Sequence, residues 1–194
     1  MNKEIIRCGW CTGDPSYEAY HDEEWGVPIK RTQSLFRLLS LEGMQAGLSW
    51  ITVLRKREAM ESAFFGFDLE RLATSGQNEI EVWLTNEGLI RHRGKLEALV
   101  NNARRTLEVE NFAEFLWTFA PTDRPVYASL KSVPAQTEAS SKMSTALKKL
   151  GYRFVGPTIC YAFMQSAGMV NDHVVSCWRH GPCESLQLAD SEHA

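Results

Sequence analysis

Two small groups of metal-binding residue types lie near opposite ends of this chain, and they constrain its fold more than any other feature. Cys8, Cys11 and His21 form the first group, while His173 and Cys177 form the second. On a helix, the spacing of the second pair would put both side chains on one face. A structural zinc site needs four nitrogen or sulfur ligands, so neither group suffices alone. A shared site would close a very long loop and remove much of the entropy of the unfolded chain.

Two ligand sets meet this requirement. One consists of Cys8, His21, His173 and Cys177, and the other replaces His21 with Cys11, so that Cys8-x-x-Cys11 forms a knuckle. Four protein ligands leave no open position for water, so the zinc ion of either set is expected to be structural. The alternative is that these are ordinary buried cysteines and histidines, because His-x-x-x-Cys also arises by chance.

The composition indicates one globular domain. The chain has 194 residues, of which 44% are hydrophobic, enough for a substantial core. Its net charge of −3 weighs slightly against a nucleic-acid partner, although a local stripe of basic residues can bind nucleic acid even when the net charge of the protein is not positive. No apolar run reaches the roughly 18–20 residues of a membrane span, and the first residues do not resemble a signal peptide. We therefore expect a cytoplasmic protein without a membrane partner, and a monomer is the simplest expectation. In a reducing compartment, an odd number of cysteines, 5, favours metal binding or burial over disulfides.

Helical signals dominate the chain, and no convincing strand pattern with a period of two is found, so the predicted class is all-α. Asp14-Pro15 is a typical helix start, and Gly47 ends a helix that begins near Gln33. The loop 120–137 contains three prolines and is predicted to divide two lobes around a central cleft. Residues 1–180 are predicted to form one helical domain and residues 181–194 a polar, disordered tail. The predicted helices cover residues 15–25, 33–46, 50–64, 68–74, 77–86, 92–108, 111–119, 140–150 and 158–167.

Glu42 is an acidic residue at a position where an apolar one is expected. Leu38, Leu39 and Ala46 lie on one apolar stripe of the predicted helix 33–46, and Glu42 falls in the middle of that stripe. A carboxylate that faces the core is costly unless a cation, several hydrogen-bond donors or a ligand compensates its charge. Pairing with a buried arginine, or capping by backbone N–H groups, is the purely structural explanation.

Aromatic residues accompany this carboxylate. Trp50 follows the helix of Glu42, Tyr17 and Tyr20 share one face of the predicted helix 15–25, and Trp10 lies just before it. A carboxylate beside electron-rich rings is suited to a planar, cationic ligand. Each aromatic residue taken alone is more often part of the core, but together with Glu42 they predict a binding site.

A turn bracketed by glycines, residues 151–157, joins the predicted helices 140–150 and 158–167. Such a helix–hairpin–helix unit points backbone N–H groups and a helix N-terminus outward, and these bind phosphate without reading sequence. We therefore expect DNA contacts from Lys149, Arg153, Val155 and Gly156. A plain turn between two helices is the alternative. The basic run 91–95 is a second candidate phosphate contact, although such a run is more often a solvated helix end.

Several blocks together resemble the 3-methyladenine DNA glycosylase I family over about residues 7–178, and blocks of this length in this order are highly specific. The strongest are Arg7-Cys8-Gly9-Trp10, Ala19-Tyr20-His21-Asp22, Glu24-Trp25-Gly26-Val27-Pro28, Leu41-Glu42-Gly43, Gln45-Ala46-Gly47-Leu48-Ser49-Trp50-Ile51-Thr52-Val53-Leu54, Ile90-Arg91-His92-Arg93-Gly94-Lys95, Phe154-Val155-Gly156, Thr158-Ile159-Cys160-Tyr161 and Val170-Asn171-Asp172-His173-Val174-Val175.

The resemblance implies a helix–hairpin–helix DNA glycosylase fold. It also implies an enzyme that flips 3-methyladenine out of alkylated double-stranded DNA and removes the base by hydrolysis. It implies that Glu42, Tyr20 and Trp50 recognise the base and act in catalysis, with Trp10 and Tyr17 nearby. It implies that Gly47 and Leu48 fill the gap left by the extruded base. It also implies a structural Zn²⁺ ion bound by the first ligand set, namely Cys8, His21, His173 and Cys177.

The sequence departs from the family pattern around the zinc ligands. Cys11 is an additional thiol, and His180 and Cys183 are further candidate ligands after Cys177. The family lacks the catalytic aspartate of its wider superfamily, and Asp172 is expected to orient the segment that carries His173. Three alternative functions stay open: a zinc-containing DNA-binding module without activity, a zinc hydrolase with an open metal position, and a glycosylase with broader substrates.

Overall fold

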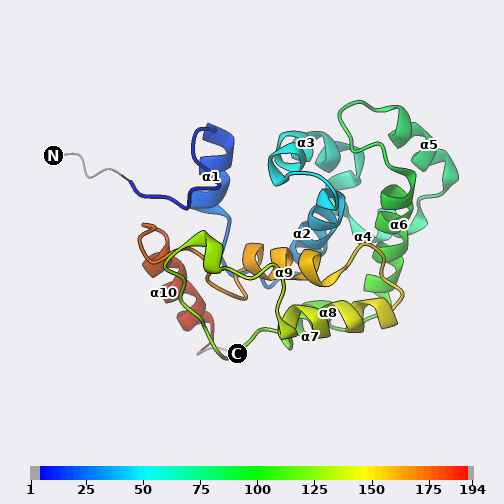
Figure 1. The fold of residues 1–194 in the computed structure, drawn as a ribbon. Coiled ribbons are helices and arrows are strands. Elements are labelled where there is room, and N and C mark those ends of the chain that lie inside the picture. Colours follow the sequence, from blue (N-terminus) through cyan, green and yellow to red (C-terminus); the bar gives the residue numbers. More distant parts are fainter. Residues whose placement is uncertain (1–4, 192–194) are drawn as a thin grey trace.

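The helix that carries Glu42 lies at the centre of the molecule. A computed structural model describes residues 5–191. In it, α2 (Thr32–Gln45) packs against α3 (Trp50–Ala63), α6 (Arg93–Leu107) and α9 (Pro157–Ser166), as Figure 1 shows. Apolar side chains are buried on most of the circumference of α2, and burial on this scale explains why it forms the core of the fold. These side chains are Leu35, Phe36, Leu38, Leu39, Leu41 and Met44.

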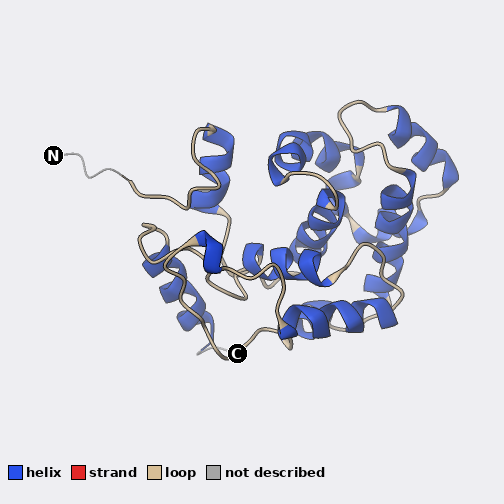
Figure 2. Cartoon of the chain, viewed as in Figure 1, coloured by secondary structure: helices blue, strands red, loops and turns tan. Residues whose placement is uncertain are grey.

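The other helices surround this core. The pair α4 and α6, and the pair α8 and α9, pack closely together. Each of the nine predicted helices is present, and no strand occurs among residues 5–191 (Figure 2), so the predicted all-α class is confirmed. None of the helices in this range is long and apolar enough to cross a membrane. The remaining elements are α1 (Pro15–Glu23), η1 (Phe65–Phe67), α4 (Leu69–Thr74), α5 (Gln77–Thr85), α7 (Phe112–Trp117), η2 (Leu130–Ser132), α8 (Glu138–Lys149) and α10 (His180–Ser191).

The prediction of a disordered tail over 181–194 is wrong for most of that segment. The helix α10 covers it as far as residue 191, and residues 192–194 lie outside the described part. Cys183 is buried against Gly26, and Gln187 donates its amide to the carbonyls of Gly26 and Val170, at 3.1 Å each. One buried thiol and one buried amide, four residues apart, give no apolar stripe, which explains why the sequence pattern did not reveal this helix.

A proline-containing loop joins α7 and α8, as predicted, and contains η2. It is tied to the segment that carries His173 and Cys177, because the Val175 backbone N–H donates to the carbonyl of Tyr127 at 3.0 Å. Loops held in this way can form one wall of a site. The division of the chain into two lobes by this loop stays a prediction.

The end of α9 makes a close backbone contact with the segment that follows α1. Gly168 has a φ of +70°, and a Cβ atom there would lie 2.5 Å from the backbone nitrogen of Pro28. The Ile29 backbone N–H donates to the carbonyl of Ala167 at 3.1 Å. Only glycine permits both the left-handed conformation and this approach.

We predict that Gly168→Ala lowers the free energy of unfolding by about 3 kcal/mol or more, because conformational strain adds to a backbone overlap. Gly66→Ala is the matched control, since Gly66 has a φ of +65° but its added Cβ would meet nothing within 4 Å. The control should lose only about 1–2 kcal/mol, from strain alone. Denaturant unfolding measures both values, and equal losses would contradict the importance of the contact with Pro28.

Candidate functional site

A cavity of about 340 Å³ opens beside α1, α2 and α9, a size that suits a small planar ligand. It brings together all five predicted pocket residues: Glu42, Tyr20, Trp50, Trp10 and Tyr17. The other lining residues are Trp25, Gln45, Leu130, Val133, Ala162, Gln165, Ser166 and Asp172.

Glu42 is buried in the wall of this cavity, with only 2% of its surface exposed. Its Oε1 accepts a hydrogen bond of 2.8 Å from the Ser166 hydroxyl, while Oε2 has no hydrogen-bond partner among the described residues. Burial raises the pKa of Glu42 from 4.5 to about 8, and the hydrogen bond from Ser166 opposes that rise. The described residues that line the cavity include no arginine or lysine, and the hydrogen bond to Glu42 comes from Ser166, so the structure does not support pairing with a buried arginine. A buried carboxylate oxygen in a cavity wall, without a partner among the described residues, could accept a hydrogen bond from a ligand.

Ser166 links the carboxylate to an aromatic wall. The Tyr20 hydroxyl donates to Ser166 Oγ at 3.0 Å, and Ser166 in turn donates to Glu42. These two hydrogen bonds hold Oε1 of Glu42, while Oε2 has no partner among the described residues. Sequence analysis missed Ser166, because a serine in the apolar helix α9 carries no signal that distinguishes a relay from a residue bonded to its own helix.

Aromatic rings form the remaining walls. The ring centroids of Tyr20 and Trp50 are 5.2 Å apart, those of Trp10 and Tyr17 are 4.9 Å apart, and those of Trp10 and Trp25 are 5.0 Å apart. Rings clustered at these distances present electron-rich faces to a planar cation. The arrangement therefore matches the ligand chemistry suggested by Glu42.

Asp172 is a second buried carboxylate at the cavity. Its Oδ2 accepts hydrogen bonds from the Tyr161 hydroxyl at 2.6 Å and from the Gln165 amide at 2.7 Å. Burial raises its pKa. These bonds join α9 to the segment that carries His173, which agrees with the orienting role expected for Asp172.

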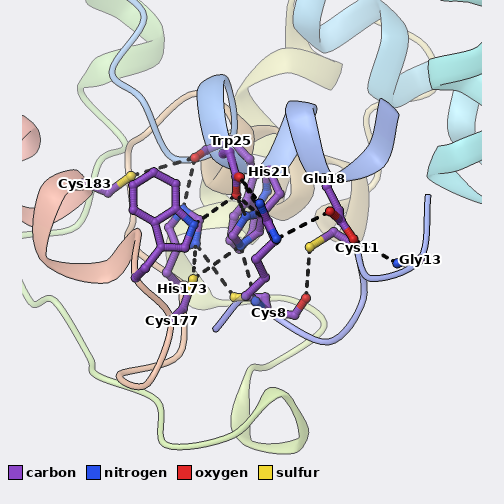
Figure 3. Close-up of polar contacts among 12 residues, drawn as sticks. Cys8, Cys11, Gly13, Glu18, His21, Trp25, His173, Cys177 and Cys183 are labelled. Carbon is purple, nitrogen blue, oxygen red and sulfur yellow. Dashed lines mark hydrogen bonds and ion pairs between the residues drawn. The ribbon is translucent and has the colours of Figure 1, made fainter. Parts of the chain in front are cut away.

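Behind the cavity, Cys8, His21, His173 and Cys177 point toward one another (Figure 3). All four are buried, and their potential ligand atoms lie within 4.8 Å of one another. His173 Nδ1 is 3.7 Å from Cys8 Sγ and 3.6 Å from Cys177 Sγ, and His21 Nε2 is 3.4 Å from Cys177 Sγ. In a tetrahedral zinc site, metal–ligand distances of about 2.3 and 2.0–2.1 Å separate sulfur from nitrogen by about 3.6 Å. These four residues could therefore hold a metal ion.

The other ring nitrogens of the two histidines are held in place. His21 Nδ1 lies 2.8 Å from Asp22, which Arg7 and Trp178 also bind, and His173 Nε2 lies 3.1 Å from the carbonyl of Trp25. Outer hydrogen bonds of this type orient histidine ligands toward a metal.

Cys11 lies outside the cluster, because its thiol donates to the carbonyl of Cys8 at 3.0 Å, so the knuckle alternative is not supported. His180 and Cys183 are not part of it either. His173 and Cys177 lie on a turn and not on a helix, and in this turn the Cys177 N–H donates to the carbonyl of Val174. A turn can bring residues four apart together as a helix does.

The residues predicted to contact DNA fall in two places. Gly47, with a φ of +76°, and Leu48, which is 43% exposed, lie in the loop after α2. Lys149, Arg153, Val155 and Gly156 lie in or beside the turn between α8 and α9, where no side chain caps the start of α9. Val155 is buried and its carbonyl accepts from Ser144, so its side chain does not face solvent.

Glu42→Gln is predicted to stabilise the free protein increasingly as the pH rises from about 4.5 to 8. The folded wild type retains a proton that the unfolded chain releases in this range, so its stability falls with rising pH, while glutamine does not titrate. The difference should reach a few kcal/mol, since one pKa unit corresponds to about 1.4 kcal/mol. Glu87→Gln, at a side chain that is 88% exposed, is the control. Parallel stability–pH curves for wild type and Glu42→Gln would contradict the prediction.

Comparisons with known proteins agree with this geometry. A family model of methyladenine glycosylases matches residues 10–180. DNA-3-methyladenine glycosylase 1 of Escherichia coli (strain K12) is 49% identical over 88% of this chain and 95% of its own length. A crystal structure of 3-methyladenine DNA glycosylase I superimposes with a TM-score of 0.88 at 49% identity, covering 90% of this chain and 100% of the other. A variant crystallised in complex with 3-methyladenine gives a TM-score of 0.85 at 34% identity, covering 90% and 97%. The chain therefore belongs to the methyladenine glycosylase family.

Proposed function

We propose that this protein is a DNA repair enzyme that removes 3-methyladenine from alkylated double-stranded DNA by hydrolysing the bond between base and sugar. The relatives described above carry this activity in their names, and one was crystallised with the base itself. The observation that carries the proposal is Glu42, a buried carboxylate with one unpaired oxygen beside aromatic rings.

The chemistry of the lesion suits this pocket. Methylation at N3 gives adenine a positive charge and weakens its bond to the sugar. Tyr20 and Trp50 enclose the cationic ring, and Glu42 accepts hydrogen bonds from the adenine edge and complements its charge. A cation beside Glu42 favours its ionised form, so lesion binding lowers the pKa of this carboxyl and releases its proton.

Little acid catalysis is then required. Water attacks the sugar carbon, the electron pair of the glycosidic bond moves to the base, which leaves neutral, and the water proton passes to solvent. Positioning and electrostatics are the main contributions of the protein. Normal adenine lacks the charge, and guanine presents a carbonyl acceptor to the carboxylate, so both are bound weakly.

Two elements engage the DNA in this proposal. The uncapped N-terminus of α9 at Gly156, together with Lys149, Arg153 and the backbone of Val155, binds phosphates in the manner of a helix–hairpin–helix motif. The exposed side chain of Leu48, next to Gly47, enters the stack where the damaged nucleotide is extruded. The loop lies between Gln45 and Trp50, which both line the cavity.

We also propose that the Cys8, His21, His173 and Cys177 cluster binds one structural zinc ion. The spacing of sulfur and nitrogen atoms and the outer hydrogen bonds support this assignment. With four protein ligands the ion would have no position for water, so its contribution is to stability.

The direct test is release of the base from methylated DNA, measured chromatographically. We expect free 3-methyladenine, and no release by the folded protein would remove the proposed function. Glu42→Gln should lower kcat/KM by on the order of 100-fold, because a charge-assisted contact is lost in a site that excludes water. Unchanged rate and unchanged preference over 7-methylguanine would exclude Glu42 from recognition.

For the metal, we expect one zinc ion per chain by elemental analysis, and loss of that ion in Cys177→Ser. The free energy of unfolding should fall by about 3 kcal/mol or more, because the ion closes a loop of most of the chain. Cys11→Ser is the matched control, since Cys11 is equally buried but bonds only to the Cys8 carbonyl. Full zinc content in Cys177→Ser would disprove the ligand assignment.

A further inference from the structure

Helix α6 presents two buried polar side chains to the two elements that we assign to DNA binding. Lys95 and Asn102 are 6% and 7% exposed. They are seven residues apart, which is about two helical turns, so they lie on one face of α6 and about 10 Å apart along its axis. Buried polar groups persist only where their hydrogen bonds are satisfied, so their partners indicate their role.

Lys95 holds the end of α2 and the start of the loop that carries Leu48. Its ammonium group donates to the carbonyls of Met44 at 2.8 Å and Ala46 at 2.6 Å. These carbonyls have no partner within the helix, and the negative end of the helix dipole favours a cation there. Gly47 follows directly with a φ of +76°. Lys95 therefore ties the C-terminal end of α2, from which the loop departs, to α6.

Asn102 holds the turn between α8 and α9 with both ends of its amide. Its Oδ1 accepts from the Arg153 backbone N–H, and its Nδ2 donates to the Arg153 carbonyl, both at 3.0 Å. The next residue, Phe154, has a φ of +57°, a conformation that non-glycine residues rarely adopt. A strained conformation persists only where the surrounding structure imposes it, and the paired bonds from Asn102 do so here.

We propose that α6 acts as a rigid spacer that sets the distance between the loop that enters the base stack and the turn that binds phosphate, with Lys95 and Asn102 as its two positioning residues. This rests on the proposed function. When the turn is seated on a phosphate, the helix places Leu48 at one defined step of the duplex. Neither residue lines the base cavity, so neither contacts the base.

The first test separates base binding from base extrusion. Lys95→Met keeps the aliphatic volume but removes both hydrogen bonds, and Lys95→Gln keeps a shorter donor in case the first variant folds poorly. We expect both to bind free 3-methyladenine within about threefold of wild type, while kcat on methylated duplex falls by on the order of 10–100-fold, the effect of misplacing a positioning element by about 1 Å. Lys56→Met is the control, because Lys56 of α3 also donates to a backbone carbonyl, that of Glu87, yet touches neither element.

The second test asks whether Lys95 acts through Leu48. In the double variant Lys95→Met, Leu48→Ala, the loss in kcat should be no larger than that of the more severe single variant. Both changes impair the same step, the insertion of Leu48 into the base stack, so their effects should not add. Asn102→Leu should instead raise KM and weaken binding to undamaged duplex, with kcat nearly unchanged.

Three outcomes would overturn the proposal that α6 is a spacer. They are wild-type kcat in the Lys95 variants, a loss of kcat in the double variant equal to the product of the two single losses, or equal losses of affinity for the free base and of kcat on the duplex. Absence of base release by the wild-type chain would instead remove the proposed function, and that result is visible before any variant is made.

Discussion

The fold is organised around the burial of one carboxylate. Placing Glu42 on the core helix α2 opposes folding at neutral pH, since burial raises its pKa to about 8. The surrounding leucines and phenylalanines of α2 and the hydrogen bond from Ser166 offset part of that cost. In the function proposed above, a positively charged base that enters the cavity compensates the remainder. Stability and recognition therefore act in opposite directions at this residue, as is common in binding sites.

Most of the secondary structure could be predicted from local patterns. Three local features of the sequence appear in the structure as predicted. Asp14 caps the start of α1, Gly47 follows the end of α2, and α2 buries its apolar stripe. Helix α10 was missed because its burial comes from Cys183 and Gln187, whose packing depends on segments more than 150 residues away in sequence, such as Gly26. Local periodicity carries no information about such contacts.

Glu42 and four of the aromatic rings of the cavity were predictable, whereas Trp25, Asp172 and the polar connections were not. Glu42 is conspicuous because it breaks an apolar stripe, and the nearby tyrosines and tryptophans follow from it. Ser166 and Gln165 come from the opposite end of the chain, and the packing of α9 on α2 brings them to the cavity. Asp172, which follows α9, is held there by its hydrogen bonds to Tyr161 and Gln165. Choosing between Cys11 and His21 as the fourth member of the candidate metal cluster also required coordinates, because the spacing permits both.

Tyr20 and His21 are neighbours in α1, but one faces the cavity and the other the cluster of cysteines and histidines. Tyr20 of the aromatic walls is consequently carried by the same short helix that contacts His173 and Cys177, near the other end of the chain, through His21. During synthesis, which starts at the N-terminus, α1 is made early but finds these partners late. Helices α2 and α3 can therefore form on the ribosome before the residues of α9 that line the other side of the cavity have been translated.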